Sequence, residues 1–256
     1  MIPQIPLMNT HVSPAGSGAN ATASDLERAM LAQANPADAN ILMRFFKTGP
    51  GQYGEGDKFL GIKNPKTRRT AKAFQALPVP EAVRAAQSPW HELRLCSLLI
   101  LANRYQRKKT DEEERTTIFG HYADLARRGF VNNWDLVDLT APGIAGAYAF
   151  AHGMETLERF AASGHLWEER IAVLAMFPFI RANQLDMPFR MVDRFLAHPH
   201  DLMHKACGWM LREIGKRDRA ALTAYLQENK AAMPRTALRY AIEHYPEPER
   251  KAFLAR

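Results

Sequence analysis

A tryptophan and an aspartate lie four residues apart in the segment from Val131 to Asp138. Asn133 has the side chain of a helix N-cap, which would place Trp134 and Asp138 one turn apart on one helix face. Asp135 would then lie in the first turn, where a carboxylate offsets the helix dipole. Asp138 lies too deep for that role and has apolar neighbours, so it is a candidate for stabilising a cation beside an aromatic ring. The alternative is an Asp on the surface, or a buried one bonded to a neighbouring turn.

Two further tryptophans, Trp167 and Trp209, also lie near residues that could have a functional role. Arg170 follows Trp167 by three residues, so both would share a helix face, although a core Trp with a surface Arg fits the spacing equally. Gly208 precedes Trp209 in the middle of a helical pattern, where glycine costs about 1 kcal/mol relative to alanine. We therefore expect a close helix approach at Gly208, and either a ligand contact or a core position for Trp209.

Other motifs of catalysis are missing from the sequence. His198, His200 and His204 have a spacing that could hold zinc, but no carboxylate or thiolate pattern accompanies them. The glycine pair Gly54 and Gly56 follows no strand, so it is no dinucleotide fingerprint, and no phosphate-binding loop or hydrolase motif occurs. We expect neither a metal nor a cofactor.

Helical patterns account for most of the chain. A capping-box pattern at Ser24–Glu27 opens the first helix, Asn35-Pro36 ends it, and a second helix has its apolar face at 41–46. A helix beginning at Pro65 is expected to stop at Pro78, and another begins at Ser88-Pro89. Later helices are expected near 110–128, 132–140, 143–152, 154–163, 166–181, 187–197, 200–216, 218–228, 234–244 and 247–255. No alternating run is long enough for a strand.

Short helices with short joints predict an all-α fold, an α-solenoid of HEAT-like antiparallel helix pairs, with a compact bundle as the alternative. Residues 1–24 lack the basic and apolar regions of a signal peptide and are expected to form a flexible tail before one domain at 25–256. Cys96 and Cys207 fit no disulfide framework, which favours a reduced, cytoplasmic protein.

Positive charge is concentrated in clusters. The 256 residues carry a formal charge of +7, and the segment from Lys58 to Lys72 holds six basic residues and no acid. Each cluster alone can be a solvated helix end, but several at helix ends favour a phosphate-binding surface. We therefore predict a curved solenoid with a basic concave face suited to duplex DNA. The expected DNA contacts are Lys63, Lys66, Arg68, Arg69, Arg212 and Lys216.

The sequence resembles the bacterial DNA alkylation repair glycosylases with HEAT-like repeats, the AlkD-like family. The matching segments follow the family's order from about residue 38 to 245, and they are Tyr53–Ile62 with Pro65, Arg68 and Arg69 following, Asn133–Asp138, Leu166–Ala172 and Lys205–Glu213. The resemblance implies a monofunctional DNA N-glycosylase that hydrolyses the N-glycosidic bond of cationic N3- and N7-alkylated purines in duplex DNA.

Roles follow residue by residue from this resemblance. Asp138 matches the catalytic carboxylate, Trp134 and Trp209 match two aromatic walls, and Arg170 matches a contact to a backbone phosphate. Tyr53 aligns more loosely with a family tyrosine. Relatives often carry two basic residues after the second motif's tryptophan, whereas this chain has Glu169 before Arg170.

A rival interpretation comes from the fold, because many α-solenoids are non-catalytic DNA-binding or protein-scaffold modules. An inactive relative would be expected to lose the Asp or a Trp, and this chain keeps Asp138, Trp134 and Trp209. We expect a monomer that acts on DNA containing alkylated purines, has no membrane contact, and is cytoplasmic and associated with the nucleoid.

Overall fold

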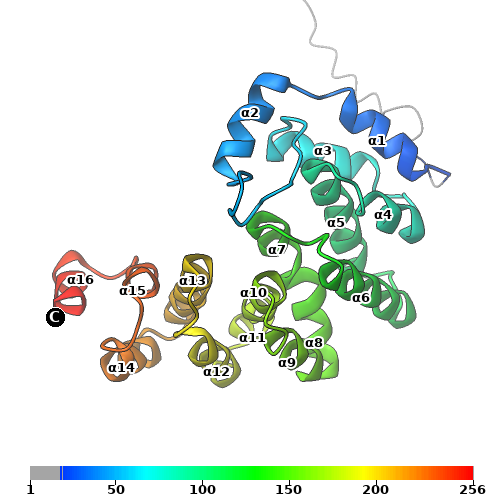
Figure 1. Ribbon diagram of the computed structural model, residues 1–256. Coiled ribbons are helices and arrows are strands. Elements are labelled where there is room, and N and C mark those ends of the chain that lie inside the picture. Colours follow the sequence, from blue (N-terminus) through cyan, green and yellow to red (C-terminus); the bar gives the residue numbers. More distant parts are fainter. Residues whose placement is uncertain (1–17, 19, 256) are drawn as a thin grey trace, which may run out of the picture.

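The computed structural model describes residue 18 and residues 20–255, so the predicted tail lies almost entirely outside the described residues. Helices follow one another from α1 to α16 in chain order (Figure 1). Their bounds are α1 Ala23–Leu31, α2 Pro36–Phe45, α3 Asn64–Ala73, α4 Val79–Ala85, α5 His91–Tyr105, α6 Glu112–Arg127, α7 Trp134–Thr140, η1 Pro142–Gly146, α8 Ala147–His152, α9 Glu155–Ala161, α10 Leu166–Leu174, α11 Phe177–Arg181, α12 Asp186–Phe195, α13 Asp201–Arg217, α14 Arg219–Asn229, α15 Arg235–Ala241 and α16 Glu247–Leu254.

The all-helical prediction is confirmed. Within the described part of the chain no strand forms, and the single β-bridge joins Lys58 to Trp90. Neighbouring helices pack in pairs, among them α3 with α5, α9 with α10 and α13 with α15, around one large apolar core, and a second, small cluster of Ala39, Phe46 and Phe59 packs against Trp134. This arrangement is consistent with a solenoid, whereas a curved shape with a basic concave face stays a prediction.

Several helix boundaries differ from expectation for local reasons. Helix α1 begins at Ala23, because Thr22 rather than Ser24 is the N-cap and exchanges hydrogen bonds with Asp25. Helix α4 is not among the expected helices. Pro78, expected only to stop the preceding helix, is the N-cap of α4, and Pro80 lies in its first turn, where proline is favoured.

Two helices expected to be single are divided. The predicted helix at 166–181 is split into α10 and α11 around Ala175–Met176, and the one at 143–152 begins as the π-helix η1.

The close approach expected at Gly208 is confirmed. A Cβ atom at this position would lie 2.4 Å from the carbonyl oxygen of Ala237, so α13 and α15 meet at a distance that only glycine permits. In the part of the chain that the structure describes, no helix is both long and apolar enough to cross a membrane.

Candidate active site

Helix α7 places Trp134 and Asp138 at the same hollow. Asn133 caps the helix, and its side-chain oxygen accepts a hydrogen bond from the Trp134 backbone N–H at 2.9 Å. Trp134 and Asp138 are one turn apart and both line a hollow of about 810 Å³. Other walls come from distant segments, with Arg44 and Phe45 on α2, Tyr53 on the following loop, Arg170 on α10, Lys205 and Trp209 on α13, and Tyr240 on α15.

Arg170 forms a two-point ion pair with Asp138. Its Nε and Nη2 atoms each donate to one carboxylate oxygen at 2.9 Å, and Nη1 donates to the backbone carbonyl of Leu202. The Arg170 side chain is only 5% exposed, against 13% for Asp138. The predicted phosphate contact of Arg170 stays a prediction, and two of the five guanidinium N–H groups are left over after these three bonds.

The Asp138 carboxyl has two opposing influences on its pKa. Burial disfavours the ionised form and raises the pKa above its ordinary value, and Asp135 adds to this, while the charge and hydrogen bonds of Arg170 lower it. The net direction is upward. Arg170 therefore supports the ionised carboxylate at a place where burial works against it.

Aromatic rings support both walls of the hollow. Trp134 stacks on Phe46 with centroids 5.2 Å apart and meets Phe45 edge to face at 6.0 Å. Trp209 packs against Phe177 at 5.2 Å and donates from its indole Nε1 to Glu213 at 3.1 Å. Both indoles are half-buried, so each keeps part of its surface open.

The predicted DNA contacts fall into three groups. Tyr53 lines the hollow, in edge-to-face contact with Trp167 at 5.9 Å. Arg212 and Lys216 on α13 are ion-paired with acidic neighbours, Glu243 and Glu213. The basic residues around α3 are exposed at its N-terminal half, with Lys63 close to Asp38 at 3.6 Å, and they are Lys63, Lys66, Arg68 and Arg69.

Three cations at the hollow were missed by the sequence analysis, namely Arg44, Lys47 and Lys205. Lys205 pairs with Asp201 at 2.8 Å, whereas Arg44 and Lys47 have no ion-pair partner among the described residues. For Arg44 and Lys47, the only available signal was their place beside the aromatic pair of Phe45 and Phe46, at one end of the apolar face of α2.

Asp135 does not have the simple role that its position suggested. The side chain is buried, with 2% exposure, and accepts a hydrogen bond from His91 at 2.9 Å. Asp135 lies in the first turn of α7, as expected, and it also belongs to a buried polar network that the sequence analysis did not predict. The sequence around Asp135 gives no sign of its partner His91, which lies 44 residues away.

The three histidines at 198–204 cap a helix and bind neighbours. His198 pairs through Nε2 with Glu169 at 3.0 Å, so the glutamate that stands where relatives often have a basic residue is buried and bonded within the fold. His200 accepts the Leu202 backbone N–H as the N-cap of α13, and His204 bonds the His198 carbonyl. No group of three metal-binding side chains converges between residues 20 and 255.

A family model and a solved structure are similar to this chain. The model of the family described as DNA alkylation repair enzyme matches residues 26–245. A solved structure described as a predicted DNA alkylation repair enzyme from Enterococcus faecalis superimposes with a TM-score of 0.64 at 18% identity, covering 84% of this chain and 98% of that chain. No curated protein matches the sequence.

Proposed function

Because the chain belongs to the DNA alkylation repair enzyme family, we propose that it is a DNA glycosylase for cationic N3- and N7-alkylated purines in duplex DNA. The observation that carries this proposal is the placement of Asp138 at one hollow with the two indoles of Trp134 and Trp209. A carboxylate that shares a hollow with two aromatic rings is suited to a transition state that carries positive charge.

The proposed chemistry needs little from the protein beyond electrostatics. Alkylation at N3 or N7 makes the purine cationic and therefore a good leaving group without protonation. Departure of the base leaves an oxocarbenium-like sugar, as in glycoside hydrolysis. The Asp138 carboxylate would stabilise this charge, and the indoles would add cation–π attraction. Water then completes hydrolysis, leaving an abasic site in an uncut strand.

Binding is proposed to depend on phosphate contacts. Arg44 and Lys47 lie at the hollow without ion-pair partners among the described residues, and exposed basic residues surround α3. Phosphate contacts position a duplex without reading its sequence, so we propose duplex DNA as the partner, with little sequence preference. Arg170 would use its two remaining N–H groups for the phosphate nearest the lesion.

Release of 7-methylguanine from a methylated duplex tests the proposal directly. The wild-type protein should release base, and Asp138→Asn should bind the duplex nearly as well while excising at least about 100-fold more slowly, as expected for the loss of ~3 kcal/mol of electrostatic stabilisation. Asp124→Asn, at a half-buried carboxylate on α6, is the control and should keep the wild-type rate. Duplex binding without any base release would favour the non-catalytic interpretation.

A further inference from the structure

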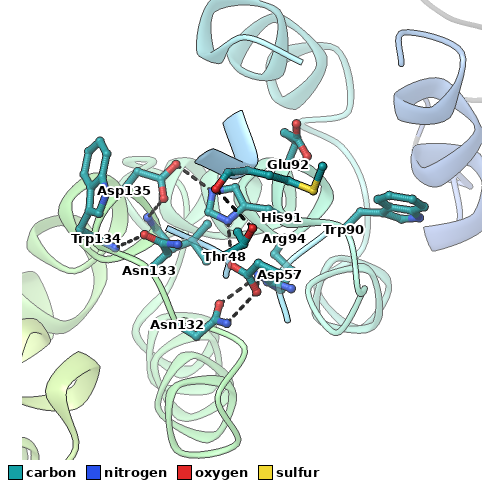
Figure 2. A network of polar contacts seen from close by, with 12 residues as sticks. Thr48, Asp57, Trp90, His91, Glu92, Arg94, Asn132, Asn133, Trp134 and Asp135 are labelled. Carbon is teal, nitrogen blue, oxygen red and sulfur yellow. Dashed lines mark hydrogen bonds and ion pairs between the residues drawn. The ribbon is translucent and has the colours of Figure 1, made fainter. Parts of the chain in front are cut away.

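Beneath the Trp134 wall lies a buried chain of alternating charges. His91 contacts Asp135 through Nε2 at 2.9 Å and Asp57 through Nδ1 at 3.3 Å. Asp57 also accepts from Arg94 at 2.7 Å and from the Asn132 amide at 2.9 Å. Figure 2 shows His91 between the two carboxylates, with Asn132 reaching Asp57 from the chain before α7.

This network joins three segments that are far apart in sequence. Asp57 lies on the loop between α2 and α3, His91 and Arg94 begin α5, and Asn132 and Asp135 flank the start of α7. Trp134 is the residue next to Asp135 and only two residues from Asn132 (Figure 2). The backbone that carries the indole is therefore fixed on both sides by groups that end on Asp57 and His91.

His91 also reaches the indole through its ring. The imidazole stacks on Phe59 at 4.5 Å and is tilted against Phe46 at 4.9 Å. Phe46 in turn stacks on Trp134 at 5.2 Å, on the aromatic wall of the hollow. His91 is therefore connected to the Trp134 indole in two ways, by hydrogen bonds through Asp135 and by ring contacts through Phe46.

We propose that His91 is a positioning residue for base excision, which holds the Trp134 indole in place at the hollow through Asp135 and Phe46. This role rests on the proposed glycosylase function. Cation–π attraction depends on the distance and orientation of the ring face, so a displaced indole stabilises the sugar cation less well.

Charge balance supports this role. Asp57 and Asp135 contribute two buried negative charges and Arg94, which is paired with Asp57, contributes one positive charge, so a protonated His91 makes the group neutral. Burial alone would lower the pKa of His91, but the charge and hydrogen bond of Asp135, with Asp57, raise it to about 9. Glu92, the other buried acid at this end of α5, is bound instead to the backbone N–H groups of the loop at 60–62.

The test compares His91→Gln with wild type in single-turnover release of 7-methylguanine and, separately, in duplex affinity. We expect excision to fall about two- to thirty-fold, the range for one weakened cation–π partner, with affinity unchanged. In a Trp134→Ala background, His91→Gln should have no further effect on the rate. Additive losses in the double variant would overturn the proposal.

Glu92→Gln is the matched control. It is equally buried on the same helix but bonds to the loop at 60–62, so it should lower thermal stability while keeping the wild-type rate in folded protein. A loss of rate like that of His91→Gln would mean that any damage to this region slows excision, which would also overturn the proposal.

If His91→Gln does not fold, the same comparison with Asp135→Asn approaches the contact from α7. If neither variant folds, the pH dependence of the wild-type excision rate is the test. The rate should fall as the pH rises through about 9, where His91 loses its proton, while circular dichroism still reports folded protein. A rate that does not change with pH in this range would reject the role of His91. Absence of base release by the wild type overturns the proposed function as well, whereas equal rates for wild type and His91→Gln overturn only the role of His91.

Discussion

Arg170 and Asp138 form an ion pair in the protein without DNA. The pair is held by two hydrogen bonds of 2.9 Å, and the arginine is the more deeply buried partner. A carboxylate that is paired in this way is weaker as a counter-charge than a free one, yet without Arg170 the burial of Asp138 would raise its pKa further. The ion pair with Arg170 therefore weakens the electrostatic field of Asp138, but it favours the ionised form of the carboxylate and fixes its orientation.

The effect of Arg170 on the pKa of Asp138 predicts a change in the pH dependence of excision. Asp138 acts only when ionised, burial already raises its pKa, and Arg170 opposes that rise. Replacing Arg170 by methionine should raise the pKa further, so the acid limb of kcat/KM for 7-methylguanine should move to higher pH. Arg170→Lys keeps the charge without the fork and should move the limb less. Both profiles are measured below the unfolding temperature of each variant, because breaking a buried pair costs about 3–5 kcal/mol of stability. Identical acid limbs in all three proteins would contradict this account of Asp138.

At the scale of the elements, local chemistry explains which parts were predictable. Helix α7 was predicted because its cap, Asn133, and its chemical pair, Trp134 and Asp138, lie within six residues of each other. The His91 network was missed because Asn132 and Asp57 are 75 residues apart and neither shows a motif. Asp138 was singled out from the sequence as a candidate catalytic carboxylate, which stays a prediction, and it lies at the hollow. Its ion pair to Arg170, 32 residues away, is visible only in the fold.

Glycine 208 offers a test of how the site elements are spaced. A Cβ atom there would lie 2.4 Å from the Ala237 carbonyl oxygen and 2.6 Å from the Tyr240 Cβ atom. Gly208→Ala should therefore push α15 away from α13 and lower the free energy of unfolding by about 1–3 kcal/mol, as overpacking does. Gly120→Ala on α6 meets open space and should stabilise instead, by up to about 1 kcal/mol. Urea unfolding of both variants makes the comparison, and a stabilised Gly208→Ala would show that the two helices separate freely.

Across the whole molecule, the hollow is made from residues between 44 and 240, so no single repeat contains the site. The helices bring together acids on α7 and α13, indoles on α7 and α13, and cations on α2, α10 and α13. Charge is distributed unevenly around the hollow. Arg44 on α2 and Lys47 just after it have no ion-pair partner among the described residues, whereas Lys205 and Lys216 are paired with acids on their own helix. Net charge alone therefore overstates how many cations are free to meet phosphate.

That distinction predicts the salt dependence of duplex binding. Each cation that releases a counterion from DNA contributes about one to the slope of log K against log salt concentration. Lys47 lines the hollow without an ion-pair partner among the described residues, so Lys47→Gln should reduce the slope by about one. Lys216→Gln should reduce it less, because Glu213 already neutralises Lys216 at 2.7 Å. Lys251→Gln, on α16 and paired with Glu247, is the control and should leave the slope unchanged. Binding titrations of an unmodified duplex between about 50 and 200 mM salt give all four slopes. Equal losses for Lys47 and Lys251 would mean that the cations act through net charge, and that the hollow has no special part in holding the backbone.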